Sequence, residues 1–328
     1  MSRFTITRRA VMGTALAAPS LAHAQTRRPL RVIVPFPPGG AVDSLGRILA
    51  DRLAPVLDQQ VVVDNRSGAG GLIGADAVAK AVPDGTTIGI IGAATLCAAP
   101  FLLPSMPFDV ARDFRPVTQI TDSAVIIAVG APVAATRGWD SLAALLTWAR
   151  ANPGKFNISH AGVSTVSHLV TSALSKQAGV EFNMIPYRGG AQAANDMLSG
   201  TLDGSADLPS ALIPLAEAGR VRLLGISSGQ RLALLPNVPA FSETAGLAGM
   251  DVRSWNIILL PAGAPEAEAA RLHGAIRQVA ATAAFRDALR PLGYDAVTSE
   301  SLAAAAALVR DETPRWRQLV EASGARVE

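Results

Sequence analysis

A short apolar strand, a loop of small residues and an amphipathic helix follow one another repeatedly along the chain. The strand over 30–36 runs into the loop 37–40 and then into a helix with one apolar face. The same order returns after the strands over 60–63, 156–159 and 182–185. This alternation predicts mainly parallel sheets with right-handed crossovers and with helices on both faces. At about 100–200 residues per domain, the 328 residues of the chain correspond to two α/β domains.

The composition indicates a chain that can bury large cores, because 49% of its residues are hydrophobic and 17% are charged. Two long helical patterns finish the chain, over 265–289 and 301–323. Pro314 is expected to kink or divide the second of these helices, because proline lacks the N–H of the helical hydrogen bond.

The charge balance gives no general attraction to nucleic acid or to anionic lipid. The chain has 29 basic and 26 acidic residues, and its first 24 residues contain Arg3, Arg8 and Arg9 and no acid, so the remainder carries 26 of each. Cys97 is the single cysteine, which excludes an intramolecular disulfide and a multi-cysteine zinc site. We therefore predict no metal site and no bound cofactor.

The N-terminus has the features of an export signal. Arg8 and Arg9 precede an apolar run over 10–21 and the small-residue cleavage pattern 22–24. Paired arginines favour the twin-arginine route, and a general secretory signal that happens to contain two arginines remains the alternative. No cysteine follows the cleavage pattern, and no later stretch supplies the 18 or more apolar residues of a membrane span. We expect a soluble periplasmic protein that begins near Gln25.

Three strand-to-helix loops are candidate anion sites, because N–H groups at a helix N-terminus are unpaired and carry positive potential. They are Gly39-Gly40, Ser164-Thr165 and Gly189-Gly190. The simpler interpretation of each glycine is a tight turn. Ligands of open α/β sheets bind at the carboxyl ends of strands, so several such loops together predict a ligand site there.

Several segments resemble one known family. They are PFPPGG followed by Asp43, the block VVVDNRSGAGGLIGADAVAKAVPDG over 61–85, SHAGVSTVSHL, PYRGG, LPNVPAFSETAG and LPAGAP after Trp255. Their order and content resemble the Bug-type (Bordetella uptake gene) family, the extracytoplasmic solute receptors of tripartite tricarboxylate transporters. The resemblance extends over essentially the whole chain after residue 24, and the block 61–85 is its most specific part.

The resemblance implies a two-lobed periplasmic binding protein fold of the type II kind, with the ligand cleft between the lobes. It implies a monomer that holds a small organic acid and delivers this carboxylate to integral-membrane permease subunits. We place the first lobe at 25–126 and 255–328 and the second lobe at 127–254. Strands near 125–129 and 255–260 are then expected to cross between the lobes.

The resemblance also implies positions for the ligand site. The first loop would contact a carboxylate mainly through main chain and ordered water, and the loop ending in Ser-His together with one acid would bind from the other lobe. The implied residues are Phe36, Pro38, Gly39, Gly40, Ser164, Thr165, Ser167, His168 and Asp207. The chain departs from the family pattern at Val163-Ser164, where Asn-Gly is frequent, and at Leu208, where Asn is frequent.

Three of the candidate side chains have structural interpretations as well. Asp207 either faces the cleft or caps the helix that Pro209 begins. Arg188, beside Gly189, either pairs with a second ligand carboxylate or lies on the surface. His168 either hydrogen-bonds within its loop or caps its helix, and these are favoured over metal ligation because neither it nor His160 has an acid or thiol at ligand spacing.

Two other classes of function fit parts of the sequence. Residues 225–229 match G-x-S-x-G after a strand, which would make Ser227 the nucleophile of an exported α/β hydrolase, although prolines interrupt the expected helix. Residues 68–74 resemble a dinucleotide fingerprint with its third glycine one place late, and a tight turn is the simpler interpretation. A periplasmic receptor that signals to a membrane sensor is the third alternative.

Overall fold

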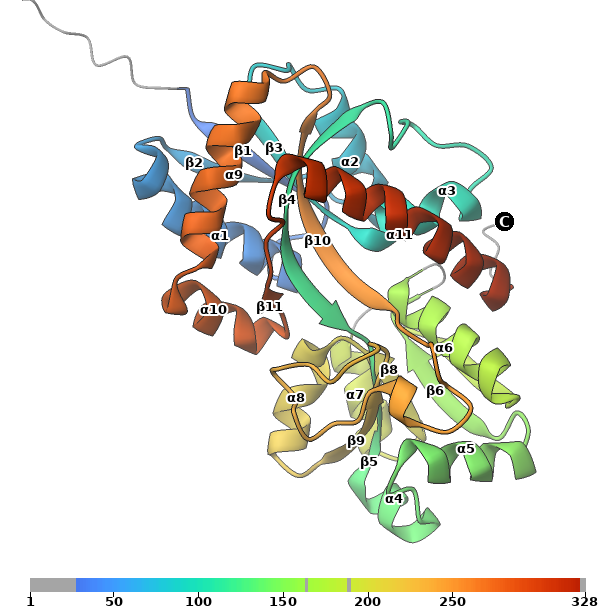
Figure 1. Ribbon diagram of the computed structural model, residues 1–328. Coiled ribbons are helices and arrows are strands. Elements are labelled where there is room, and N and C mark those ends of the chain that lie inside the picture. Colours follow the sequence, from blue (N-terminus) through green and yellow to red (C-terminus); the bar gives the residue numbers. More distant parts are fainter. Residues whose placement is uncertain (1–27, 163–164, 188–189, 325–328) are drawn as a thin grey trace, which may run out of the picture.

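Two sheets, each covered by helices, form the two lobes of the molecule (Figure 1). The computed structural model describes residues 28–162, 165–187 and 190–324. The predicted signal peptide 1–24 and the candidate residues Ser164, Arg188 and Gly189 lie outside these ranges. None of the described helices is both long enough and apolar enough to cross a membrane.

The first lobe is built on a six-stranded sheet with the order β11-β4-β10-β3-β1-β2. Strand β1 is parallel to its neighbours β2 and β3, whereas β10 is antiparallel to both β3 and β4. The strands are β1 (Leu30–Val34), β2 (Val61–Asn65), β3 (Thr87–Gly92), β4 (Phe114–Ala124), β10 (Arg253–Pro261) and β11 (Asp295–Ala296). The helices are α1 (Ala41–Leu57), η1 (Ala69–Gly71), α2 (Leu72–Ala79), η2 (Ala94–Ala98), α3 (Ala99–Leu102), α9 (Glu266–Ala280), α10 (Ala283–Leu289), η4 (Arg290–Leu292) and α11 (Leu302–Ser323).

The continuous apolar run of β1 is explained by burial on both faces of the sheet. Leu30, Val32 and Val34 belong to the core under α1, α9 and α10, whereas Ile33 belongs to the core under α2, η2 and α11. Successive side chains of a strand point to opposite faces, so a strand with helices on both sides must be apolar throughout. The predicted α/β class with covered sheets is confirmed, although both sheets are mixed rather than mainly parallel, because β10 in this lobe and β5 (Ile126–Gly130) in the other run antiparallel to their neighbours.

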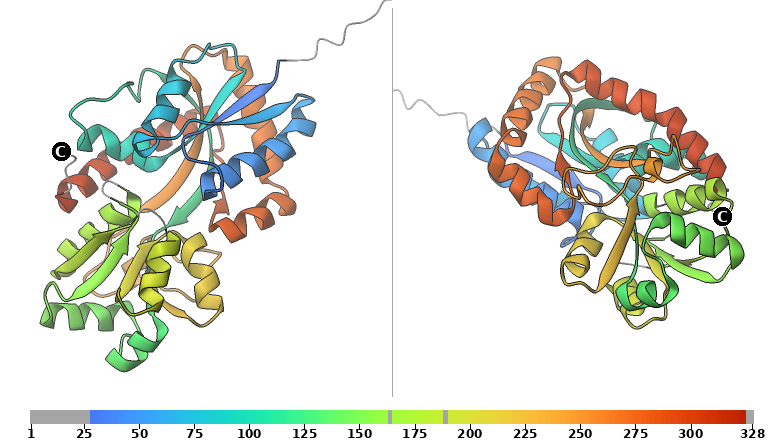
Figure 2. Two further views of the ribbon diagram at one scale, coloured as in Figure 1. Left: turned by 180° about the vertical axis from the view of Figure 1, so that it is seen from behind. Right: turned by 60° about the horizontal axis from the view of Figure 1, so that its bottom comes forward.

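The second lobe has a five-stranded sheet with the order β7-β6-β8-β5-β9. Here β6 is parallel to β7 and β8, and β5 is antiparallel to β8 and β9. Its strands are β5 (Ile126–Gly130), β6 (Phe156–His160), β7 (Phe182–Pro186), β8 (Gly204–Asp207) and β9 (Val221–Ile226). Its helices are α4 (Ala131–Arg137), α5 (Leu142–Ala151), α6 (Val166–Ala178), α7 (Gly190–Leu198), α8 (Pro209–Glu217) and η3 (Phe241–Glu243). The last helix of the first lobe, α11, ends beside α6 of the second (Figure 2).

The C-terminal helices differ from the sequence prediction in two ways. The single helix predicted over 265–289 is two helices, because Thr282 begins a new one by accepting a hydrogen bond from the N–H of Phe285 on its side-chain oxygen. Conversely, Pro314 does not divide α11. Pro314 is exposed, and on that side water can bond the carbonyl that loses its donor.

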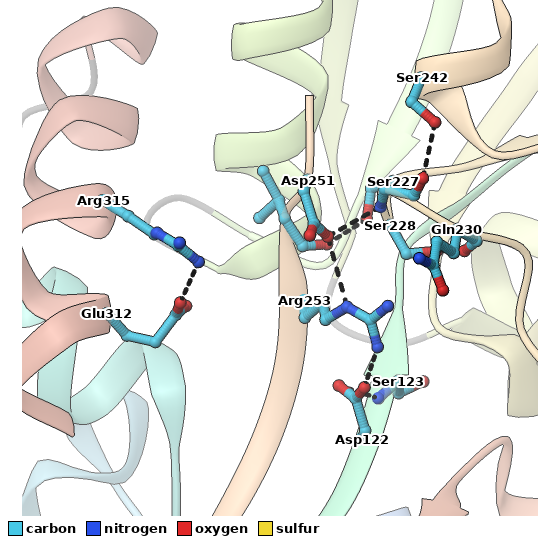
Figure 3. A network of polar contacts seen from close by, with 12 residues as sticks. Asp122, Ser123, Ser227, Ser228, Gln230, Ser242, Asp251, Arg253, Glu312 and Arg315 are labelled. Atoms are coloured by element: carbon cyan, nitrogen blue, oxygen red, sulfur yellow. Dashed lines mark hydrogen bonds and ion pairs between the residues drawn. The ribbon is translucent and has the colours of Figure 1, made fainter. Parts of the chain in front are cut away.

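One serine joins the two strands that pass between the lobes. The fully buried Ser227 donates its N–H to the carbonyl of Val125 (2.9 Å) and accepts the N–H of Val125 on its hydroxyl (3.0 Å). The same hydroxyl donates to the carbonyl of Val252 (2.7 Å), whose N–H returns to the carbonyl of Ser227 (2.8 Å) (Figure 3). Val125 lies between β4 and β5, and Val252 directly precedes β10, so Ser227 fixes both connections at one point.

These contacts remove the structural basis for the hydrolase alternative. A nucleophilic serine needs an accessible hydroxyl on a turn that leads directly into a helix. The Ser227 hydroxyl is buried and already donates its proton to a carbonyl, and the chain after it forms bends rather than a helix. The G-x-S-x-G pattern therefore has a structural role here.

Asp43 holds the first strand-to-helix loop. The residue is 2% exposed, and its carboxylate accepts the N–H of Gly39 (2.9 Å) and the Nε–H of Arg47 (2.9 Å) on one oxygen. The other oxygen accepts from the amide of Asn65 (2.9 Å), which also donates to the carbonyl of Phe36 (3.0 Å). Hydrogen bonding by Arg47, then by Gly39 and Asn65, lowers the pKa of Asp43 to about 2 although burial opposes this.

Replacing Ser227 by alanine tests the joint between the lobes. Ser227→Ala leaves the N–H of Val125 buried without its acceptor, so we expect the free energy of unfolding to fall by about 1–3 kcal/mol in urea titrations. Ser199→Ala is the control, since its exposed hydroxyl also donates to a backbone carbonyl. Equal stability of the two variants would show that the Ser227 hydroxyl does not contribute to the joint.

Replacing Asp43 by asparagine tests the anchoring of the first loop. Asparagine points an N–H₂ group at one of the existing donors, so we expect a loss of about 2 kcal/mol of stability at pH 7. The folded-state pKa lies below the ordinary 3.8, so the stabilisation is present above about pH 4 and is lost as the pH falls toward 2. The difference between wild type and Asp43→Asn should therefore shrink over that interval in acid unfolding curves. Asp287→Asn, which changes an exposed carboxylate on α10, should show no such difference.

Candidate functional site: the cleft between the lobes

A cavity of about 530 Å³ lies between the lobes and is lined by both of them. The first lobe contributes the segments that follow β1 and β3 and the turn before α2. The second lobe contributes the segments that follow β6 and β8. The lining residues include Phe36, Ala69, Gly70, Leu72, Ala94, Thr95, Leu102, Leu103, Ala161, Thr165, Ser167, Asp207, Leu208 and Asn256. The volume is within the usual range for a small-molecule site, and the position at strand ends is where α/β sheets bind ligands.

The structure brings together some of the predicted site residues and not others. Those that line the cavity are Phe36, Thr165, Ser167 and Asp207. Those that are described but do not line it are Pro38, Gly39, Gly40 and His168. The N–H of Gly39 is donated to Asp43, so this donor is not presented to a ligand in the structure. Ligand contact by any of these residues stays a prediction.

The loop between β6 and α6 is held by its own hydroxyl groups. Thr165 caps α6 by accepting the N–H of His168 (3.4 Å), and it donates its hydroxyl proton to the carbonyl of Gly162 (2.7 Å). The Ser167 hydroxyl accepts the N–H of Ala161 (3.0 Å) and lies 3.1 Å from the Thr165 hydroxyl. These side chains therefore shape the wall of the cleft, whereas sequence reasoning treated them as ligand donors alone.

Two histidines stack behind this wall. The rings of His160 and His168 lie 4.6 Å apart at an angle of 31°. Burial lowers the pKa of both, and in His168 the neighbouring His160 adds to this and brings the pKa to about 4. Both imidazoles are thus neutral at pH 7. Within the described ranges, no group of three or more His, Cys, Asp or Glu side chains is placed to hold a metal ion.

Asp207 is the acid of the cleft. It ends β8, and one carboxylate oxygen accepts the N–H of the next residue, Leu208 (2.7 Å). Burial raises the pKa of Asp207, which favours its protonated form more than in water. The capping interpretation was wrong, because Leu208 occupies the cap position of α8 and makes no side-chain cap bond.

Sequence reasoning missed the turn before α2 as part of the site. Residues 68–71 all have positive φ, and Ala69 (φ 48°) adopts this conformation without being glycine. The Thr95 hydroxyl donates to the carbonyl of Gly70 (3.1 Å), and both residues line the cavity. The glycine-rich run was correctly interpreted as a tight turn, and backbone strain next to the cleft is the additional signal.

The sequence is similar to those of known proteins over most of its length. Residues 45–325 match the family described as "Tripartite tricarboxylate transporter family receptor". A UPF0065 protein from the tcbD-tcbE intergenic region of Pseudomonas sp. strain P51 is 37% identical, over 95% of this chain and 93% of the relative. Protein BugT of Bordetella pertussis is 32% identical, over 95% and 94%.

Two solved structures share the two-lobed architecture. A protein of R. palustris with adipate has a TM-score of 0.81 at 29% identity and covers 92% of this chain and 100% of its own. MatC of Rhodopseudomonas palustris, with bound malate, has a TM-score of 0.75 at 28% identity, with 90% and 99% covered. The chain therefore belongs to the Bug-type receptors of the tripartite tricarboxylate transporter family.

Proposed function

We propose that the chain is a periplasmic solute-binding protein that captures a small organic acid between its lobes and delivers it to a membrane permease. The observation that carries the proposal is the 530 Å³ cavity lined by both lobes. A ligand in this position contacts both lobes at once, so its binding favours their closure. The adipate and the malate of the two solved relatives are carboxylates of a size that such a cavity accommodates.

The candidate binding groups differ between the lobes. Loop N–H groups at the N-termini of α1 and α6 supply positive potential for a carboxylate, reached directly or through water. Asp207 supplies an acceptor for a ligand O–H or N–H group, or shares a proton with a carboxylic acid. We retain the lobe boundaries at 126/127 and 254/255, export to the periplasm and the permease partner as parts of the same proposal.

Calorimetry and thermal-shift measurements with mono-, di- and tricarboxylates test this function. We expect at least one acid to raise the melting temperature, because it binds the folded state only, and small-angle scattering should show a more compact bound form. Ala94→Phe projects a ring into the cavity that Ala94 lines and should weaken binding at least tenfold. Ala303→Phe, on the exposed side of α11, is the control. A panel with no binder, or a ligand bound equally by Ala94→Phe, would contradict the cleft as the site.

Export is tested separately by replacing Arg8 and Arg9 with lysine. The twin-arginine route requires the arginine pair, so the double variant should accumulate in the cytoplasm with its N-terminus uncleaved. Fractionation and N-terminal sequencing measure the outcome. Normal export of the double variant, with cleavage near Ala24, would show that the general secretory route carries the protein.

A further inference from the structure

Three apolar side chains of the cleft stand apart from the hydrophobic cores. Phe36, Leu103 and Leu208 are half-buried and line the cavity. None of the three belongs to the hydrophobic clusters that the described residues form. By contrast, Leu72 and Leu102 line the cavity and also pack into the first-lobe core. Phe36, Leu103 and Leu208 therefore expose apolar surface to the cleft that the hydrophobic clusters of the described residues do not cover.

The main-chain conformation and contacts of each of these residues place its side chain at the cleft. The carbonyl of Phe36 is held by Asn65, and the tip of its ring lies 3.7 Å from where a Cβ on Gly71 would be. Leu103 ends α3 in an extended conformation (φ −103°, ψ 143°). Leu208 is extended as well (φ −71°, ψ 156°), and its N–H is held by Asp207. Residues held in this way are preorganised for ligand contact, so little conformational entropy is lost when a ligand binds.

The three side chains come from opposite walls. Phe36 and Leu103 belong to the first lobe, and Leu208 belongs to the second. Closure of the lobes brings the Leu208 wall toward the other two, and a ligand between them removes their exposed surface from water. Polar side chains of both lobes also line the cavity. The hydroxyls of Thr95 and Thr165 and the amide of Asn256 already donate hydrogen bonds to protein groups.

We propose that Phe36, Leu103 and Leu208 form an apolar clamp, and that the acid this protein selects has a hydrocarbon body, either a methylene chain or a ring without hydroxyl groups. The inference rests on the proposed carboxylate-binding function and narrows it. Consider an acid with the same carbon skeleton as such a ligand but with several hydroxyl groups. Its hydroxyl groups lose their hydrogen bonds to water when they contact these three side chains, and the side chains offer no hydrogen bonds in return. Its binding is therefore weaker.

Pairs of acids with one skeleton test the clamp on the full mature chain. The pairs are cyclohexanecarboxylate with quinate, hexanoate with gluconate, and adipate with galactarate. In each pair that yields a binder, calorimetry should give at least tenfold tighter binding for the acid without hydroxyl groups on its chain or ring. Binding of both members with equal affinity, or tighter binding of the hydroxylated member, would overturn the clamp while leaving the carboxylate function in place. No binding by any of the six acids or by the wider carboxylate panel would contradict the carboxylate function itself.

Two variants separate the clamp from the rest of the cleft. Leucine and asparagine side chains have the same number of heavy atoms and branch at the same position, so Leu208→Asn and Leu103→Asn change polarity while keeping the branching of the side chain. Each should reduce the preference for the apolar member about fivefold to tenfold, with an unchanged melting temperature in the absence of ligand. Val82→Asn is the control, because Val82 is 68% exposed and does not line the cavity. If both leucine variants weaken the two members of a pair by the same factor, the leucines do not select the ligand and the proposal fails.

Discussion

The hydrogen bonds of Ser227 to Val125 and Val252 are the constraint on which the two-lobed structure depends. Chain segments that leave a sheet carry N–H and C=O groups with no strand partner, and such groups are costly when buried. Ser227 supplies the missing partners for both crossings with its backbone and its side chain. Next to it, Arg253 pairs with Asp122 of β4 and with Asp251 (Figure 3). The polar groups of this joint are therefore hydrogen-bonded or ion-paired, and the joint involves few residues. Lobes connected by so few residues can rotate relative to one another.

The arrangement of the first loop explains why the cleft is less polar than a run of glycines at a helix start suggests. The N-terminus of α1 attracts anions, and Asp43 already provides one from within the same helix. Its carboxylate uses the N–H of Gly39, and through Asn65 it also holds the carbonyl of Phe36. The Asp43 carboxylate thus offsets part of the positive potential of the helix N-terminus and fixes the loop. What the loop then presents to the cavity is the ring of Phe36.

Much of the fold was predictable because its signals are local. The apolar runs of β1 and β10 require covered faces on both sides, and this fixes the α/β class before any tertiary contact is known. The site was predictable only in part. Asp207 ends β8, and Phe36 follows β1. Thr165 and Ser167 lie at the start of α6, after β6. Their position after strands places them near the cleft. Other features of the site depend on side-chain packing and on the pairing of distant strands. They are the hydrogen bond from Gly39 to Asp43, the left-handed conformation of Ala69, and the position of Asn256, which β10 brings to the cavity. For the same reason, the pattern around Ser227 was ambiguous, since a five-residue motif does not reveal what its serine hydroxyl meets.

Each wall of the cleft is fixed within its own lobe, so the angle between the lobes is the principal variable that a ligand can change. Asn65 holds Phe36 in the first lobe, and Gly162 holds Thr165 in the second. The lobes also meet where α11 reaches α6, because Leu319 packs against the cores of both. A change in the angle between the lobes would alter the packing of α11 on α6, and the free energy of that change is subtracted from the contact energy of the ligand. A ligand that contacts only one wall gains no further contacts when the lobes close. A ligand that fills the space between Phe36 and Leu208 contacts both walls, and these contacts offset the free energy of the change between α11 and α6. Affinity and closure are for this reason two consequences of the same contacts.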